Sequence, residues 1–339
     1  MISVSIIIPV YNVSRYIRRC LHSVINQTYA GPMECIIVDD RGQDDSMEKV
    51  AEILKDYEGP IKFHTIIHEE NMGLSEARNS GIRQATGDYL LFIDSDDELT
   101  HSAVELLAAQ VEKHPGVDMV YGQFYCAPYE FPSVPYQGPE YLGTPEECKR
   151  AMLRFRILPG YAHNKLIRRS FVVDHQLFFE RGLLIEDNMW MWLISKNIES
   201  IAVVKEATYV YYKNPGSIMN NQKNNVRKIE SWLKILSRKC DTLDHLCGKE
   251  QLRHTIEILL NVDSDIRYIL EGDERRSRLD ALKGMIKKLQ KHNSSVRDLR
   301  TFLSLLCLKL ELNLPITVGN RLFWTLHRAS KMFVVWPKP

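Results

Sequence analysis

The stretch VSIIIPV, residues 4–10, is a nearly unbroken run of β-branched and apolar residues. Such a run is typical of a β-strand that is covered on both faces, as in a parallel sheet. Apolar residues then recur at the three- and four-residue spacing of one helix face, at Tyr16, Ile17, Cys20, Leu21, Val24 and Ile25. The beginning of the chain therefore predicts a buried strand followed by an amphipathic helix.

The same alternation continues through the first 120 residues. Three more segments have the composition of strands, namely ECIIVDD (34–40), IKFHTII (61–67) and GDYLLFID (87–94). Helical patterns separate them, from Met47 to Leu54 and over GLSEARNSGIRQAT (73–86). Strands that alternate with helices over short connections form βαβ units, which combine into a doubly wound sheet. We therefore predict an α/β fold with a mostly parallel sheet.

Length, composition and charge define the broad class of the protein. The chain has 339 residues, of which 45% are hydrophobic and 26% charged, so it can form a full core and one further region. Its 44 lysines and arginines balance 43 acidic residues, which gives no overall attraction to nucleic acid. The seven cysteines contain no CxxC pair, which argues against a disulfide framework and a zinc site. Without a basic leader or a long apolar run, the sequence indicates a cytoplasmic globular protein.

The residues that close each strand are the candidate site, because ligands of doubly wound sheets bind at the carboxyl ends of the strands. No GxGxxG follows the first strand and no GxxxxGK[ST] occurs, so the common phosphate-binding loops are absent from the sequence. Carboxylates stand there instead, and they repel phosphate unless a divalent cation lies between. The strand ends therefore predict a nucleotide diphosphate held through Mn²⁺ or Mg²⁺. They are Pro9 to Asn12, Asp39 and Asp40, His68 to Asn71, and Asp94 to Asp97.

Each of these aspartates also has a simpler interpretation. Asp39 and Asp40 precede RGQDDS (41–46), where they could cap the next helix or shape a turn. Aspartates after a strand are likewise common loop residues. However, Asp94, Asp96 and Asp97 occupy three of four positions beside a buried run, where their charges would repel one another without a cation. This repulsion favours the metal interpretation.

Four motifs in this part of the chain resemble the family 2 glycosyltransferases, whose nucleotide-sugar domain has the GT-A fold. They are PVYN (9–12), VDD (38–40), NMGLSEARNSGI (71–82) and IDSDD (93–97). A weaker resemblance continues through HNKLIRRSF (163–171), IEDNMWMW (185–192) and YVYYKNPGSIM (209–219). The resemblance implies an enzyme that moves a sugar from a nucleotide diphosphate, with a UDP-sugar expected, to a hydroxyl of a saccharide or lipid-linked acceptor. It also suggests a role in the assembly of a bacterial surface polysaccharide.

The resemblance assigns roles to individual residues. In the family, the position of Asp40 accepts a hydrogen bond from a pyrimidine N–H, and that of Tyr11 forms an aromatic wall. The position of Asp94 approaches the ribose and the metal, that of Asp96 is the direct metal ligand, and Asp97 is the more dispensable of the three. The donor-binding residues implied in this way are Pro9, Tyr11, Asn12, Asp39, Asp40, Arg78, Asp94 and Ser95.

The pair Glu186 and Asp187 matches the position of the family's general base. In the resembling enzymes the aspartate removes the proton of the acceptor hydroxyl while that oxygen attacks the sugar carbon opposite the leaving nucleotide. A single displacement of this kind inverts the anomeric configuration. The alternative is that both carboxylates only begin a helix, where negative charge is favourable to the helix dipole.

The rest of the chain differs from the alternating part. Residues 122–145 contain five prolines among tyrosines and glycines, so we expect an acceptor-side loop instead of a helix or central strand. Apolar periods from about residue 223 predict an α-helical appendage. We therefore divide the chain into a nucleotide-sugar-binding and catalytic domain, 1–220, and a helical C-terminal region, 221–339.

The tail after Glu311 contains no acidic residue. On a helix its apolar side chains would form one stripe beside basic residues, and such a stripe resembles an interfacial membrane anchor. It would equally suit docking on the protein's own helices or on a second subunit. The sequence thus leaves open a peripheral membrane contact and a homodimer. The residues of the stripe are Leu322, Leu326, Ala329, Phe333 and Trp336.

Two other functions compete with the glycosyltransferase interpretation. The haloacid-dehalogenase phosphatases also end a strand in DxD, but their motif continues DxDx[TV] on the first strand. Here the fifth position is Glu98, and the strand is about the fourth. The second alternative is a GT-A fold without activity, since a fold does not establish a function. The intact DxD and the Glu186–Asp187 pair favour an enzyme.

Overall fold

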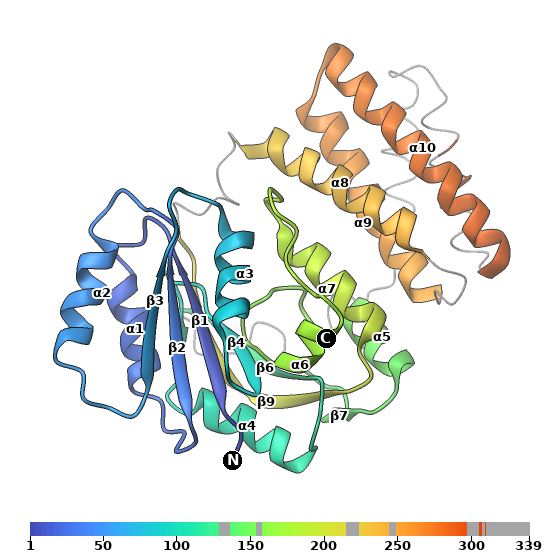
Figure 1. The fold of residues 1–339 in the computed structure, drawn as a ribbon. Coiled ribbons are helices and arrows are strands. Elements are labelled where there is room, and N and C mark those ends of the chain that lie inside the picture. The colour runs from blue at the N-terminus through green and yellow to red at the C-terminus, as the bar shows by residue number, and fades with distance from the viewer. Residues whose placement is uncertain are drawn as a thin grey trace. The chain divides into compact units, whose positions relative to one another are not determined.

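The computed structural model describes residues 1–128, 136–153, 158–214, 224–243 and 249–296, together with 305, 306 and 309. The chain separates into two compact units, residues 1–220 (unit 1) and residues 221–339 (unit 2). Unit 1 contains a sheet with helices on both faces, and the described part of unit 2 is helical (Figure 1).

The described strands of unit 1 form one nine-stranded sheet in the order β3-β2-β1-β4-β8-β6-β9-β5, with β7 paired to β9. β8, β5 and β7 run antiparallel to their neighbours, whereas the other strands share one direction. The predicted mostly parallel sheet is therefore confirmed. The strands are β1 (Val4–Val10), β2 (Met33–Asp39), β3 (Lys62–Ile67), β4 (Tyr89–Phe92), β5 (Glu98–Leu99), β6 (Met119–Ala127), β7 (Tyr141–Leu142), β8 (Lys165–Arg168) and β9 (Ile201–Tyr212).

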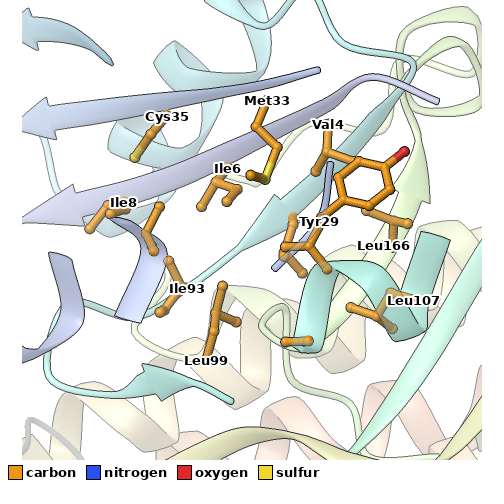
Figure 2. Packing of buried hydrophobic residues seen from close by; sticks show 14 of the residues in the cluster. Val4, Ile6, Ile8, Tyr29, Met33, Cys35, Ile93, Leu99, Leu107 and Leu166 are labelled. Carbon is orange, nitrogen blue, oxygen red and sulfur yellow. The ribbon is translucent and has the colours of Figure 1, made fainter. Parts of the chain in front are cut away.

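Both faces of β1 are buried because its side chains alternate in direction. Val4, Ile6 and Ile8 lie in one cluster with Leu107 of α4, as Figure 2 shows. Ile7 lies in a second cluster with residues of α3 and α7. The predicted strand covered on two sides is thus confirmed. The helices of unit 1 are α1 (Ile17–Ile25), α2 (Ser46–Lys55), α3 (Leu74–Gln84), α4 (Ala103–Lys113), α5 (Pro145–Leu153), α6 (Arg169–Asp174) and α7 (Glu186–Asn197).

The segment 122–145 is not a loop throughout. Residues 122–127 continue β6 and pair in parallel with β9, so the expected loop was wrong for this stretch. The reason lies in the position of the prolines, because the first of them is Pro128 and residues 122–127 contain none. The ladder does shift register around Gln123, where β6 is irregular.

Within its described residues, unit 2 is helical, as the apolar periods from about residue 223 predict. Its described helices are α8 (Asn225–Thr242), α9 (Lys249–Ile269) and α10 (Gly272–Val296), and their apolar faces share one buried cluster. An ion pair between Arg278 and Glu230 links α10 to α8. The predicted tail stripe lies outside the described residues. Among the helices that the structure describes, none is both long and apolar enough to span a membrane.

Candidate functional site

The carboxyl ends of β1, β2 and β4 meet at one edge of the sheet. Val10 lies beside Asp39 in the register of β1 with β2, and Ile7 lies beside Phe92 in the register of β1 with β4. Asp94 follows two residues after the end of β4. The two groups of aspartates, more than fifty positions apart in the chain, therefore belong to neighbouring strand ends, as the parallel topology requires.

Asp94 is paired through both carboxylate oxygens. Its Oδ1 accepts a hydrogen bond from Arg78 Nη2 at 2.8 Å, and its Oδ2 lies 3.1 Å from His163 Nδ1. Burial opposes ionisation, but the Arg78 guanidinium and His163 hold the pKa of Asp94 well below its usual range. Asp94 is therefore a fixed negative charge at the strand ends.

Asp96 and Asp97 are held from β9 and the residues that follow it. Asp96 Oδ2 accepts a hydrogen bond from Asn214 Nδ2 at 3.0 Å. Asp97 Oδ2 accepts from the Tyr209 hydroxyl at 2.7 Å, and its Oδ1 accepts from a backbone N–H of β9 at 2.8 Å. Burial raises the pKa of both carboxyls, that of Asp97 to about 8, and the charge of Asp94 adds to the effect. The three aspartates thus resist ionising together.

This group of side chains fits a divalent cation. Carboxylate oxygens of Asp94 and Asp97 and a ring nitrogen of His163 lie within 4.8 Å of one another. Asp96, the metal ligand implied by the resemblance, lies between Asp94 and Asp97 in the sequence, and its side chain is partly exposed. Carboxylate oxygens are the ligands that Mn²⁺ and Mg²⁺ prefer, and a cation would relieve the repulsion between these carboxylates. His163 is the member of this group that the histidine spacing in the sequence does not reveal.

Arg78 connects the two acidic motifs. It lies on α3, is 2% exposed, and donates from Nη1 to Glu186 Oε1 at 2.5 Å as well as from Nη2 to Asp94. The ring of Phe179 lies 5.2 Å from the guanidinium carbon. The guanidinium therefore stands between the end of β4 and the start of α7, where it neutralises one carboxylate of each motif.

Glu186 and Asp187 begin α7 but differ in their surroundings. Glu186 is buried, and burial raises its pKa to about 7 against the opposing effect of Arg78. Asp187 is partly exposed, and burial likewise raises its pKa against the effect of Arg78. A carboxylate with a raised pKa is a better proton acceptor near neutral pH. Glu186 thus anchors the helix end through Arg78, and Asp187 is the more exposed member of the pair.

The segment before β8 brings His163 to the strand ends. The His163 ring is stacked between Tyr161 and Tyr209, at centroid distances of 5.0 and 4.5 Å. Lys165, two residues later, is 1% exposed and donates from Nζ to the carbonyl oxygens of Tyr161 and His163. Burial lowers the pKa of Lys165 to about 7. Backbone and rings together fix the direction of the imidazole.

Asn164 completes the support of this segment. Its φ of 58° is in the left-handed region, and its side-chain amide donates to Gly122 O at 2.6 Å and to Gln123 O at 3.0 Å. Its Oδ1 accepts from Thr208 Oγ1 at 2.5 Å. Only glycine fits at 122, because an added Cβ would lie 1.8 Å from Thr208 Oγ1. Asn164 therefore has a structural role beside His163, because it joins the segment before β8 to β6 and β9.

The residues of the proposed nucleoside side surround the end of β1. Tyr11 is 45% exposed, so its ring is accessible. Asn12 has a φ of 52°, and its Oδ1 accepts from Gln43 N, in the loop between β2 and α2, at 2.6 Å. Asp39 Oδ1 accepts from the N–H two residues later at 2.9 Å. Pro9 and Ser95 are buried. Sequence reasoning placed these residues at one edge, and the structure gives Asn12 and Asp39 local hydrogen-bond partners there.

Comparisons with known proteins agree with this architecture. The model of glycosyl transferase family 2 matches residues 5–175. EpsH of Bacillus subtilis is 30% identical over 282 residues, which cover 81% of this chain and 79% of EpsH. The crystal structure of S. aureus TarS residues 1–349 in complex with UDP-GlcNAc superposes with a TM-score of 0.68 at 21% identity, covering 91% of this chain and 90% of that one. That of GalNAc-T7 with UDP, GalNAc and Mn²⁺ gives 0.55 at 14% identity, covering 90% and 57%.

The chain therefore belongs to glycosyl transferase family 2. It is a glycosyltransferase of the GT-A fold with a helical C-terminal region, as the motifs predict. The family match removes the phosphatase alternative, which would also need the DxD after the first strand and not after β4.

Proposed function

We propose that this enzyme transfers a sugar from a UDP-sugar to a hydroxyl of a saccharide or lipid-linked acceptor, with inversion at the anomeric carbon, in the synthesis of a surface polysaccharide. The observation that carries the proposal is the contact of Arg78 with both Asp94 and Glu186. Through this one guanidinium, the strand end proposed to hold the diphosphate is adjacent to the helix end proposed to hold the base. The UDP-GlcNAc in the TarS complex supports uridine as the donor base.

On the donor side, we assign Asp94 and Asp96 as ligands of Mn²⁺ or Mg²⁺, with Asp97 and His163 beside them. Such an ion supplies positive charge to the departing diphosphate. The chain itself orients this donor set, because Asn214 fixes Asp96 and Tyr209 fixes Asp97. Asp40 is proposed to accept from the base N–H, and Tyr11 offers the exposed ring on which the base can stack.

On the acceptor side, we assign Asp187 as the general base. A sugar hydroxyl is a weak nucleophile at neutral pH, so it needs a proton acceptor at the moment of attack. Asp187 lies at the start of α7, and Glu186 holds this turn to Arg78. The hydroxyl oxygen forms the new glycosidic bond, its proton passes to Asp187, and the bond from the sugar to the diphosphate breaks.

The metal role predicts that UDP binds much more tightly in the presence of Mn²⁺ than without it. Asp96→Ala should remove most of this gain, because the repulsion between diphosphate and carboxylates is then no longer offset by a fully coordinated ion. Calorimetric titration of UDP with and without Mn²⁺ measures the effect. Asp56→Ala, at an exposed position after α2, is the matched control and should behave as the natural chain. Equal UDP affinity with and without the ion would contradict the assignment.

Charge is unevenly divided between the two units. Residues 221–339 contain 23 lysines and arginines against 13 acidic residues, whereas residues 1–220 contain 21 against 30. Three basic residues of α8 are exposed, namely Arg227, Lys234 and Arg238. Their spacings of seven and four residues place them on the same face of the helix. A basic unit attached to an acidic one is suited to an anionic membrane surface, where each nearby basic residue adds about 1 kcal/mol. We therefore propose that unit 2 makes a peripheral membrane contact.

This proposal predicts salt-sensitive binding to vesicles that contain anionic lipid and none to neutral vesicles. Removal of residues 320–339 should weaken the pelleting of the protein with vesicles, while UDP binding persists. Co-sedimentation of the full-length and shortened chains is the measurement. Equal and negligible pelleting of both chains would contradict it. A change of oligomeric state on truncation, seen by analytical ultracentrifugation, would assign the tail to a second subunit instead.

A further inference from the structure

A serine, a histidine and an aspartate form a hydrogen-bonded chain beneath the proposed nucleoside side. Ser80 Oγ lies 2.9 Å from His68 Nε2, and His68 Nδ1 lies 2.7 Å from Asp40 Oδ1. Ser80 lies on α3, His68 follows β3 directly, and Asp40 follows β2 directly. His68 is 6% exposed and Asp40 is 3% exposed. Residues of three separate elements thus form one chain of contacts that ends at a buried carboxylate.

The geometry fixes where the protons lie when Asp40 is ionised. A carboxylate only accepts, so His68 Nδ1 carries the hydrogen of this contact. In the neutral ring Nε2 is then an acceptor, and the Ser80 hydroxyl donates to it. Ser80 therefore selects the tautomer in which His68 donates to Asp40.

Asp40 also closes the loop before α3. Its Oδ1 accepts from Met72 N at 2.8 Å, and its Oδ2 accepts from Gly73 N at 2.9 Å. A carboxylate can accept about four hydrogen bonds. Within the described part of the chain, three positions are occupied, two on Oδ1 and one on Oδ2. The remaining position, on Oδ2, is the one that a ligand N–H can use.

We infer that His68 and Ser80 are positioning residues for base recognition. They orient the Asp40 carboxylate so that Oδ2 faces a base that presents an N–H, as uracil does at N3, and rejects a base that presents a lone pair there, as cytosine does. The inference rests on the proposed nucleoside role of Asp40. A site built to bond an N–H discriminates strongly against an analogue without it, because the buried acceptor is left unpaired.

The same order of groups activates the nucleophile of serine hydrolases, but the surroundings of Ser80 do not suit that chemistry. Ser80 lies inside α3, where the neighbouring backbone N–H groups bond within the helix. They are therefore not available to stabilise an oxyanion. The chain of contacts serves orientation, not nucleophilic attack.

The test is the ratio of CDP to UDP dissociation constants in Mn²⁺, measured calorimetrically on the full chain. His68→Leu removes the donor to Asp40 and should lower this ratio about tenfold, the size expected for one hydrogen bond to a charged group. His68→Asn keeps a side-chain N–H near the place of Nδ1 and should restore most of the ratio. Ser80→Ala should lower it about threefold, as for a neutral hydrogen bond.

A merely structural role would weaken UDP and CDP equally and leave the ratio unchanged. His64→Leu is the matched control, because His64 lies on β3, is 42% exposed and contacts Glu34 at 3.5 Å, away from Asp40. Ser80→Ala keeps the test informative if His68→Leu does not fold, and an unchanged ratio in the variants that fold would overturn the inference.

Asp40→Asn separates this inference from the proposed function. If Asp40→Asn lowers the ratio and His68→Leu does not, His68 has no positioning role and Asp40 keeps its nucleoside role. If Asp40→Asn leaves the ratio unchanged, the base is read by another residue and the nucleoside assignment of Asp40 is wrong.

Discussion

Replacing Asp187 with asparagine is expected to lower kcat by about 100-fold or more while UDP binding in Mn²⁺ keeps its affinity. Asparagine preserves the size of the side chain but cannot take the proton of the acceptor hydroxyl. Glu186 still holds the start of α7 through Arg78, so the fold of this turn should persist. Transfer is measured with a UDP-sugar and acceptor found by screening, and binding by calorimetry. Near-normal transfer would contradict the assignment of Asp187 as the base and would leave it as a negative charge at the start of a helix.

The pH dependence of transfer provides an independent check on the same residue. Burial raises the pKa of Asp187 above the ordinary value of 3.8, so its base form is lost at higher pH than that of an exposed aspartate. The kcat of the natural chain should therefore fall as the pH drops from neutrality. The residual kcat of Asp187→Asn should not show this decrease at acidic pH. Asp174→Asn, at an exposed position, is the control and should keep both rate and profile.

Replacing Arg78 with methionine is expected to lower the free energy of unfolding of unit 1 by about 3–5 kcal/mol. The substitution leaves the buried Glu186 carboxylate and the Oδ1 of Asp94 without their cationic partner. Denaturant unfolding followed by the fluorescence of the buried Trp190 and Trp192 measures the loss.

Arg83→Met is the matched control on the same helix. Arg83 is 56% exposed and pairs with Glu76 at 3.0 Å, and an exposed ion pair contributes less than about 1 kcal/mol. Equal losses for the two variants would mean that the guanidinium of Arg78 is not the group that holds the two carboxylates.

The sheet and the position of the strand-end aspartates were predictable because both follow from short-range patterns. A buried apolar run such as 4–10 specifies a strand, and parallel strands bring Asp39 and Asp94 to the same edge whatever lies between them. The resemblance of four motifs then supplied the family, which the comparisons confirm.

The partners of these aspartates could not be predicted in the same way. His163 is 69 positions from Asp94, and Tyr209 is 112 positions from Asp97. No periodicity connects residues at such separations. Asp97, which the resemblance makes the more dispensable of the three aspartates, accepts hydrogen bonds from β9 at both of its oxygens. The ion pair between Arg78 and Glu186 likewise could not be predicted from the sequence, because it depends on how α3 and α7 pack on the sheet.

The direction of β8 limits the modularity of the donor site. Because β8 runs opposite to β4 and β6, its first residues lie at the edge where those strands end, and His163 can reach Asp94. A fragment that stopped before β6 would retain every donor motif but lose three partners of its aspartates, namely His163 beside Asp94, Asn214 at Asp96 and Tyr209 at Asp97. It would also leave the backbone of β4 unpaired on one side, and such edges promote association between chains. A transplantable nucleotide-sugar module cut from this chain must therefore extend through β9 to Asn214.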